Sequence, residues 1–370
     1  MQKTPTIGIV GGGIAGLTSA YYLSQKVARS KIPHLRILLL ERSPRFGGWI
    51  QSNQLEQKYD SHVFELGART IRLHSGVASL SSHSAINTLK LLEQLNIFDS
   101  QFCPIEKTSA VYKNRLIYHN KKLVNLNDLS LVFGGKPLRY PPVFYALYEY
   151  FSEKGRISVQ DETIKSFIYR RFGHVLAEDI VEYLLDPLFK GIYAGNVANL
   201  SARSVLKKIF NLEQRYGSIL HAAFGYLIPS RENSHLLGVL FDSCVRHQTD
   251  KQKRGSQLTV MMGGAWFDQL RLGQCSDEQL MHIVMAELKK QMNLDQKPLV
   301  YSIGRLNKAI PNYYVGHEDV LDDINTLIRR NNLPLTLVGN SYRGIGISDV
   351  IFDTRVEVEY LNLETMKRKA

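Results

Sequence analysis

Cysteine is scarce in this sequence, and the few cysteines present form no recognisable pattern. Cys103, Cys244 and Cys275 are an odd number, they stand far apart, and neither a Cys-x-x-Cys pair nor clustered histidine accompanies them. A disulfide framework and a zinc site of the usual ligand spacing are therefore excluded. A reducing, non-secreted setting is the simpler expectation.

Long hydrophobic runs are also missing. The longest apolar stretches, Ile37–Leu40 and Leu333–Val338 among them, are far shorter than the roughly 20 residues of a membrane-spanning helix. Met1–Thr6 resembles neither a signal peptide nor an Arg-rich transit sequence, because a glycine-rich motif begins at Gly11. We therefore expect no transmembrane segment and no cleaved leader, so that any organelle address is internal or uncleaved.

The side-chain patterns of the commonest kinds of catalysis are absent too. The sequence offers no Ser-His-Asp arrangement, no metal-ligand spacing and no pair of carboxylates that demands acid–base chemistry. Chemistry carried by a bound organic cofactor requires none of these, because the protein then supplies binding, orientation and electrostatics.

What is present is the composition of a folded globular protein. The 370 residues are 44% hydrophobic and 10% aromatic, and 370 residues suffice for two domains or for one domain with a large insertion. There are 46 Lys and Arg against 34 Asp and Glu, a formal net charge of +12. This excess favours an anionic partner, which could be nucleic acid, a phospholipid surface or a carboxylate-bearing substrate, and charge alone does not choose among them.

The first residues carry the strongest motif. Thr6–Val10 is typical of a short buried strand, and Gly-x-Gly-x-x-Gly follows it at 11–16, before an apolar pattern of helical period. In this order the glycines allow a tight turn and a close approach of backbone to a pyrophosphate, and the helix amino terminus supplies N–H donors. A glycine-rich turn without a ligand is the alternative. The candidate residues are Gly11, Gly12, Gly13, Ile14, Ala15 and Gly16.

A second strand and a second glycine-rich turn strengthen this interpretation. The strand Leu35–Leu40 leads into Glu41, which stands 25 residues after Gly16 (41 − 16), close to the spacing of the acid that binds a ribose hydroxyl. A solvated carboxylate at a strand end is the alternative. The pair Gly47 and Gly48 follows, and two glycine-rich turns around one adenosine-sized site favour FAD over NAD.

At this point the sequence resembles a known family. Glu-x-x-x-Arg-x-Gly-Gly after the dinucleotide motif is similar to the flavin-dependent amine oxidase-like superfamily, and further segments resemble the protoporphyrinogen oxidase family over nearly the whole chain. These segments are 48–50, 64–72, 190–196, 200–203, 225–229, 261–266, 310–313 and 339–349. Ala68 stands where the family commonly has proline, which should loosen one turn without removing a ligand.

The resemblance implies an α/β fold with an FAD-binding, doubly wound (Rossmann-like) domain, a substrate domain of mixed sheet and a helical membrane-binding domain. The expected limits are 1–82 for the first part of the FAD-binding domain, 83–205 for the helical membrane-binding and substrate region, 206–325 for a remnant of the substrate domain, and 326–370 for the last part of the FAD-binding domain. The family usually runs on the order of a hundred residues longer. We place the missing internal segment, which includes a strand near the FAD adenosine, at Ala223–Phe224, and interpret the chain as a splice form, an incomplete gene model or a deletion product.

The activity implied by the resemblance is the six-electron oxidation of protoporphyrinogen IX to protoporphyrin IX, with FAD and dioxygen, in haem biosynthesis. The resemblance adds to the cofactor site Arg42, Gly48, Trp49, Gly67, Ala68, Arg69, Thr70, Asn340, Ile345, Gly346 and Ile347. It assigns to the substrate Arg115, Gly191, Leu227, Leu240 and Met261, with Arg115 bound to a propionate. Without the resemblance, Arg115 reads as a surface hairpin residue and the others as ordinary core or turn. No metal is expected.

The segment 131–151 is a dense cluster of aromatic residues beside Lys136 and Arg139. Such a composition suits the headgroup region of a bilayer, and an aromatic core of a helical subdomain is the alternative from the residues themselves. The resemblance favours peripheral attachment, in a eukaryote to the inner mitochondrial membrane on its intermembrane side, with a homodimer and ferrochelatase as partners. Nucleic acid is not expected, because basic residues are scattered without a recognition motif.

Two competing functions stay open. An internally deleted, catalytically impaired isoform would keep only the membrane-binding or dimerising surface. An oxidase of a different amine or polyene is the other, and the protoporphyrinogen oxidase motifs disfavour it.

The local patterns also predict secondary structure along the chain. We expect a helix capped by Ser84, a hairpin strand at Leu116–Tyr118, a capped helix from Asp161, and a helical stretch from Ile180 that Pro187 interrupts. A buried strand at Leu333–Val338 and a turn at 339–349 before a final helix complete the list.

Overall fold

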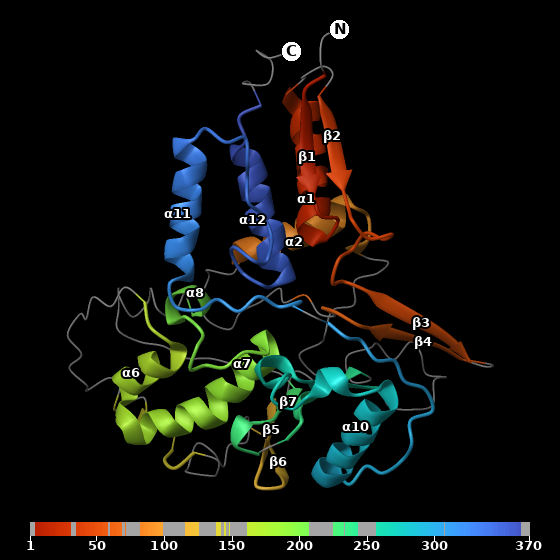
Figure 1. The fold of residues 1–370 in the computed structure, drawn as a ribbon, viewed down its shortest axis with the longest axis vertical. Coiled ribbons are helices and arrows are strands. Elements are labelled where there is room, and N and C mark those ends of the chain that lie inside the picture. Colours follow the sequence, from red (N-terminus) through yellow and green to blue (C-terminus); the bar gives the residue numbers. More distant parts are fainter. Residues whose placement is uncertain are drawn as a thin grey trace. The chain divides into compact units, whose positions relative to one another are not determined.

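The computed structural model describes most of the chain as two compact units (Figure 1). The described residues are 4–30, 35–57, 60–68, 71, 82–98, 115–125, 138–141, 144–145, 148, 161–206, 225–232, 234–242, 257–306 and 308–363. Unit 1 comprises 1–102, 302–311 and 323–370, and unit 2 comprises 103–301 and 312–322. The four predicted domain limits stay a prediction, and the predicted junction at Ala223–Phe224 lies outside the described residues.

Unit 1 begins with a strand, a helix and a parallel strand. β1 (Thr6–Val10) pairs with β2 (Arg36–Leu40) in parallel, from Thr6 opposite Arg36 to Val10 opposite Leu40. α1 (Ile14–Ser30) forms the crossover that a parallel pair needs. The predicted Rossmann-like start of the chain is confirmed. A separate hairpin of β3 (Ser52–Gln57) and β4 (Asp60–Glu65) follows.

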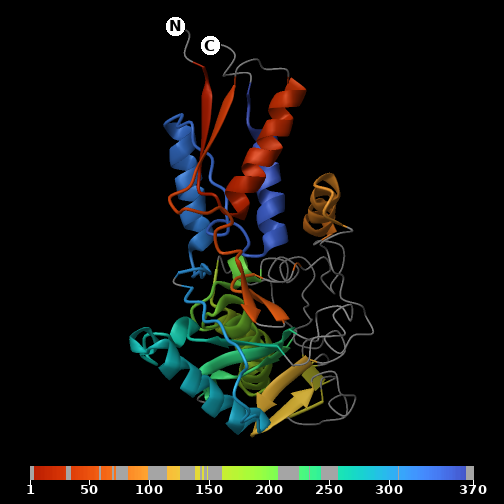
Figure 2. The ribbon, with the colours of Figure 1, turned by 90° about the vertical axis from the view of Figure 1, so that its right-hand side faces the viewer.

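The last helix of the chain returns to these first elements. α12 (Ile347–Tyr360) contacts both α1 and α2 (Ser82–Gln94), as Figure 2 shows. Tyr22, Leu23, Leu91, Ile351 and Val358 form the core between the three helices. The predicted turn and final helix are confirmed, whereas the predicted cap was wrong, because α2 already begins two residues before Ser84.

The predicted strand at Leu333–Val338 was wrong. The segment has no strand conformation, and Leu335 is 55% exposed. A strand needs a neighbour for its backbone N–H and C=O groups, and among the described residues β1 pairs only with β2. Apolar content indicated a strand, but the segment pairs with neither β1 nor β2.

Unit 2 contains a five-stranded mixed sheet. Its strands in spatial order are β6 (Lys122–Asn125), β5 (Arg115–His119), β7 (Gly225–Leu227), β8 (Leu236–Phe241) and β9 (Leu258–Met262), and only β5 and β7 run parallel. The predicted hairpin is β5–β6. α10 (Asp277–Met292) packs Leu288 against Tyr118, Ile228 and Val239 on one face of the sheet.

A run of helical segments packs beside the sheet in the same unit. α6 (Ile164–Asp179), which is kinked at Gly173, is followed directly by the π-helical segment η2 (Ile180–Leu185) and by α7 (Asp186–Tyr193) (Figure 1). The predicted capped start is confirmed, with Thr163 as the cap and Ile164, three residues after Asp161, as the first helical residue, since the Thr163 hydroxyl accepts the Ser166 N–H at 3.0 Å. The predicted interruption at Pro187 was wrong, because Pro187 occupies the first turn of α7, where a missing N–H is tolerated.

Short helices complete the two units. They are α8 (Ala202–Val205), η3 (Ser230–Glu232), η6 (Gly264–Trp266) and η7 (Leu272–Gln274). The longer helix α11 (His317–Arg330) begins in unit 2 and ends in unit 1. No helix in the described part of the chain is both long enough and apolar enough to span a bilayer.

One carboxylate joins three segments of unit 2 that are far apart in the sequence. Both oxygens of Asp161 accept the Ser201 hydroxyl at 2.8 Å, and Asp161 also accepts the backbone N–H of Gly316 at 3.0 Å. Ser201 is completely buried. Loss of this acceptor therefore leaves buried polar groups without a hydrogen-bond partner.

We expect Asp161→Ala to lower the free energy of unfolding by roughly 2–4 kcal/mol, because several hydrogen bonds to one charged acceptor disappear together. Denaturant titration measures the change. Asp319→Ala is the matched control: it removes a carboxylate that is 58% exposed and pairs with Arg203, so that its cost should stay below about 1 kcal/mol. Equal effects of the two substitutions would contradict the role of Asp161.

Candidate functional site: two glycine-rich loops and one face of the mixed sheet

The turn between β1 and α1 has the geometry that the glycine motif predicts. Gly11 has a φ of 102°, and a Cβ on Gly16 would lie 1.8 Å from the carbonyl oxygen of Gly11. The first turn of α1 therefore lies directly against the end of β1 because both positions lack a side chain. The backbone at this turn can approach a ligand closely.

The second glycine-rich turn lies against the first. The Gly47 N–H donates to the carbonyl oxygen of Gly12 at 2.8 Å, and a Cβ on Gly48 would lie 3.0 Å from the Cα of Gly13. Side chains on these glycines would fill the space between the two loops. The two turns are thus in direct backbone contact, and the adenosine site that they would form stays a prediction.

Glu41 lies at the same loops, as its spacing predicts. Its carboxylate accepts the Gly12 N–H at 2.6 Å and both the N–H and the hydroxyl of Ser43 at 2.8 Å. These hydrogen bonds, those of the Ser43 and Gly12 backbone first, lower the pKa of Glu41 from 4.5 to about 2. An ionised acceptor is therefore fixed beside the turn.

The ionisation of Glu41 makes a prediction about pH. Because the folded-state pKa is depressed, the stabilisation by the carboxylate is complete above pH 4.5 and is lost as the pH falls from 4.5 toward 2. We expect Glu41→Gln to be less stable than the parent at pH 7, and the two urea midpoints to converge as the pH falls to 3. A difference that stays constant over this range would contradict the hydrogen-bonded, ionised Glu41.

The remaining predicted cofactor residues are half-buried, exposed or outside the described residues. In unit 1 the segment before α12 reaches the glycine motif, since a Cβ on Gly339 would lie 3.8 Å from that of Ala15, and Gly346 caps α12. Gly67 lies against Trp49, because a Cβ there would meet the Trp49 carbonyl oxygen at 1.7 Å. The half-buried members near the start of α12 are Asn340, Ile345 and Ile347, the exposed members are Arg42, Trp49 and Ala68, and Arg69 and Thr70 lie outside the described residues.

In unit 2 the register of the mixed sheet aligns the predicted substrate residues. Leu227 is opposite Gly238, and Gly238 is opposite Met261. Residues paired across neighbouring strands share a face, and so do residues two apart on one strand. Leu227, Met261 and Leu240 therefore lie on one face, opposite to the face covered by α10.

Two further predicted residues, one in α7 and one in β5, lie beside these strands. α7 contacts β7 and β8, and a Cβ on Gly191 would lie 2.5 Å from a methyl carbon of Leu227. In β5, the backbone of Arg115 pairs with Gly225, two positions before the pair of Ile117 with Leu227. Their roles toward a substrate stay predictions.

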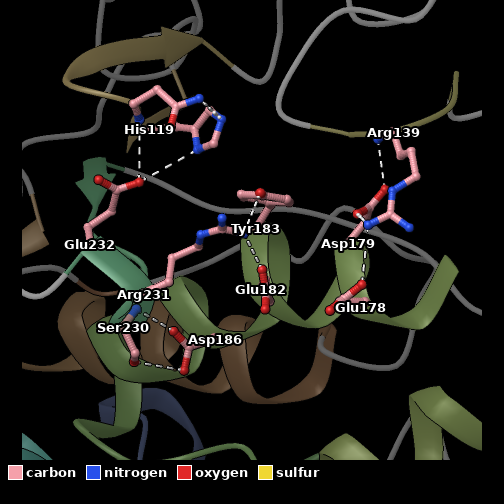
Figure 3. A network of polar contacts seen from close by, with 11 residues as sticks. His119, Arg139, Glu178, Asp179, Glu182, Tyr183, Asp186, Ser230, Arg231 and Glu232 are labelled. Carbon is pink, nitrogen blue, oxygen red and sulfur yellow. Dashed lines mark hydrogen bonds and ion pairs between the residues drawn. The ribbon is translucent and has the colours of Figure 1, made fainter. Parts of the chain in front are cut away.

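The sequence analysis missed a polar network that fixes α7 and η2 against η3. Asp186 accepts the backbone N–H and the hydroxyl of Ser230 at 2.8 and 3.1 Å, and Arg231 donates to Glu182 and, at 2.6 Å, to the Tyr183 hydroxyl (Figure 3). The participants come from segments 40 to 50 residues apart, and each polar residue on its own carries no motif. Only the fold reveals the pairing.

The aromatic cluster divides into exposed and buried members. Tyr140, Phe144 and Tyr148 are exposed, at 41%, 54% and 43%, and the rings of Tyr140 and Phe144 lie 6.4 Å apart. Tyr145 is only 6% exposed, and its hydroxyl donates to Asp179 at 2.7 Å. Tyr145 thus belongs to the core of unit 2, and the rest of the predicted cluster, with Lys136, lies outside the described residues.

Arg139, one of the two basic residues of the cluster, has acidic partners in the structure. Its guanidinium pairs with Glu178 at 3.2 Å and its backbone N–H donates to Asp179 at 2.7 Å. These carboxylates raise the pKa of Arg139. They also neutralise part of the positive charge that Arg139 would present to an anionic surface.

Comparisons with known proteins agree with this arrangement. The sequence pattern of the NAD(P)-binding Rossmann-like domain matches residues 9–80. The chain is 24% identical to the protoporphyrinogen oxidases of Bos taurus and Homo sapiens, and each alignment covers 94% of this chain and 96% of the relative. The predicted resemblance to protoporphyrinogen oxidases is confirmed. A crystal structure of a proposed protoporphyrinogen oxidase from Exiguobacterium sp. 255-15 matches this fold over the whole of both chains, with a TM-score of 0.67 at 16% identity.

The same alignments bear on the length of the chain. The alignment with the Bos taurus protoporphyrinogen oxidase extends over 479 residues, against 370 in the whole chain. The relative therefore carries on the order of a hundred residues without a counterpart here, as expected for a chain that lacks an internal segment of the protoporphyrinogen oxidase family.

Proposed function

We propose that this chain is an FAD-dependent oxidase that converts protoporphyrinogen IX to protoporphyrin IX with dioxygen. The observation that carries the proposal is the alignment of Leu227, Leu240 and Met261 on one face of the mixed sheet, with Gly191 against Leu227. A flat tetrapyrrole requires such an apolar wall. The similarity to protoporphyrinogen oxidases over 94% of the chain supports the same substrate.

The residues of unit 1 fit the adenosine diphosphate part of FAD. The turns around Gly13 and Gly48 lack side chains where they meet, α1 begins directly at the first turn, and Glu41 supplies an ionised acceptor for the ribose hydroxyls. Gly346 and Ile347, at the beginning of α12, would bind the remaining part of the cofactor through backbone N–H groups.

When bound, FAD supplies the two-electron acceptor that no side chain provides, and three such oxidations with three dioxygen molecules account for the six electrons and for three hydrogen peroxide. The side chains bind and orient the substrate. Arg115 would hold one propionate by charge-assisted hydrogen bonds, while the apolar residues of the sheet exclude water from the ring.

The test is a stoichiometric assay of the full chain supplied with excess FAD. We expect oxygen-dependent formation of fluorescent protoporphyrin, with three hydrogen peroxide for each protoporphyrin, and a flavin spectrum that dialysis weakens. Weak retention is expected because the missing segment of the family includes a strand near the adenosine. The absence of both flavin binding and porphyrin formation would overturn the proposal.

A second candidate is an impaired isoform that acts only as a membrane-bound or dimerising partner. The exposed apolar side chains on β1 and β2 favour it, since Val10 is 86% exposed and Leu40 47%. Parallel sheets are normally covered on both faces. A version of the chain with the family segment restored separates the candidates: activity in the restored version alone favours the partner role.

Arg115→Ala in an active version should raise KM for protoporphyrinogen by about 10- to 150-fold, because a charge-assisted contact of roughly 1.5–3 kcal/mol is lost. The flavin absorbance should not change. An unaltered kcat/KM would remove Arg115 from the substrate site.

The exposed aromatic side chains suggest where the protein acts. We place it peripherally on a membrane, in a eukaryotic cell on the intermembrane side of the inner mitochondrial membrane, where its homodimer would deliver product to ferrochelatase. Fractionation with carbonate and salt washes tests the peripheral attachment.

A further inference from the structure

Lys190 is the best-buried lysine of the described chain. It lies in α7, and its side chain is only 3% exposed. Lysine is almost never buried without a partner, because an ammonium loses its hydration there. A buried lysine is therefore expected to have an anionic partner or another group that stabilises its charge.

The environment of Lys190 is an aromatic face. Its Nζ lies 4.6 Å from the ring centroid of Trp266 in η6. The Ala265 N–H donates to the carbonyl oxygen of Ala194 at 2.6 Å, which fixes η6 against the end of α7. The cation–π contact holds the ammonium in place but provides no hydrogen-bond acceptor.

Asp186, one turn earlier in α7, forms neither an ion pair nor a hydrogen bond with Lys190. Both of its carboxylate oxygens accept hydrogen bonds from Ser230 (Figure 3). Within the described ranges, Lys190 makes neither an ion pair nor a side-chain hydrogen bond. Burial lowers the pKa of the Lys190 ammonium, and the attraction of Asp186, which raises this pKa, is weaker. This direction is expected for a buried charge that lacks a hydrogen-bond acceptor.

The position of Lys190 relates this charge to the proposed substrate site. It immediately precedes Gly191, which contacts Leu227, and α7 packs on β7 and β8. The sheet face that carries Leu227, Leu240 and Met261 is the face toward α7. A cation and an indole ring thus stand next to the predicted apolar wall.

We propose that Lys190, held against the indole of Trp266, binds a carboxylate of the substrate. This inference rests on the proposed function and deepens it: a tetrapyrrole with two propionates would place one at Arg115 and the other at Lys190. The propionate supplies the acceptor that the ammonium lacks, and the Trp266 ring covers the apolar part of the side chain. A neutral ester in place of the acid cannot satisfy the buried charge.

The test uses the full chain, without added FAD, and two probes, protoporphyrin IX and its dimethyl ester. Fluorescence anisotropy of the porphyrin measures both affinities. We expect the parent to prefer the diacid by at least about tenfold, and Lys190→Met to lose that much affinity for the diacid while its affinity for the ester is unchanged. Lys190→Arg should retain most of the preference, because it keeps the charge.

Lys165→Met is the matched control, because Lys165 is an exposed lysine whose Nζ lies 5.5 Å from the ring centroid of Tyr169. It should bind both probes as the parent does. Unchanged diacid affinity of a folded Lys190→Met, with melting by circular dichroism as the check, would overturn this inference and leave the proposed function intact. A parent chain that binds neither probe would overturn both.

Discussion

Gly16→Ala is expected to destabilise unit 1 and to abolish retention of FAD. The added Cβ would lie 1.8 Å from the carbonyl oxygen of Gly11 and 3.0 Å from its carbonyl carbon. Both contacts are with backbone, so that no side-chain rotation relieves them, and α1 must move away from the end of β1. Overpacking of this kind costs about 1–3 kcal/mol or more. The displaced helix would also withdraw its N–H groups from the phosphate position.

Gly8→Ala is the matched control for Gly16→Ala. Gly8 lies in β1, three residues before Gly11 and opposite Leu38 of β2, and no atom lies within 4 Å of a Cβ placed there. We expect its urea midpoint and its flavin absorbance after dialysis to equal those of the parent or to rise slightly, because alanine restricts the unfolded chain. If Gly16→Ala behaves like Gly8→Ala, the close packing of α1 on β1 is not what the motif requires.

The dinucleotide motif could be predicted from the sequence because its causes are local. Glycine is required at position 16 because the carbonyl oxygen of Gly11, only five residues away, occupies the place of a Cβ. Glu41 directly follows the strand β2, so that the strand places its carboxylate beside Gly12. The substrate face is different. Leu227 and Met261 look like any apolar strand residues, and only the register of three strands places them side by side. Their assignment came from a resemblance, since no local pattern distinguishes them.

The predictions that failed depended on distant partners. Leu333–Val338 has the composition of a buried strand, but strand formation requires pairing with a neighbour, and the segment pairs with no strand of the described chain. Lys190 was passed over because burial of a lysine against Trp266, 76 residues away in sequence (266 − 190), has no sequence pattern. Tyr145 was grouped with its exposed neighbours because the Asp179 that binds its hydroxyl lies in another helix.

The exposure of the aromatic side chains determines which variant tests membrane binding. Tyr140, Phe144 and Tyr148 are exposed, so that Ser at all three positions removes apolar surface without emptying a core. Tyr145→Phe is a control within the cluster: it should lower stability by about 1–3 kcal/mol through loss of the buried hydrogen bond to the charged Asp179, and leave vesicle binding unchanged. A second control replaces three exposed tyrosines of other segments, Tyr301, Tyr314 and Tyr360, by Ser.

We expect the parent chain to sediment with cardiolipin-containing vesicles even in 1 M salt, where the Debye length is about 3 Å. The net charge of +12 contributes attraction at low salt, but Arg139 is paired with Glu178, so that the salt-resistant part of the binding must come from insertion of the aromatic rings. The triple variant at Tyr140, Phe144 and Tyr148 should therefore bind at low salt and be released at 1 M, while both controls stay bound. Release of the second control to the same extent would mean that scattered aromatic surface, and not this cluster, contacts the membrane.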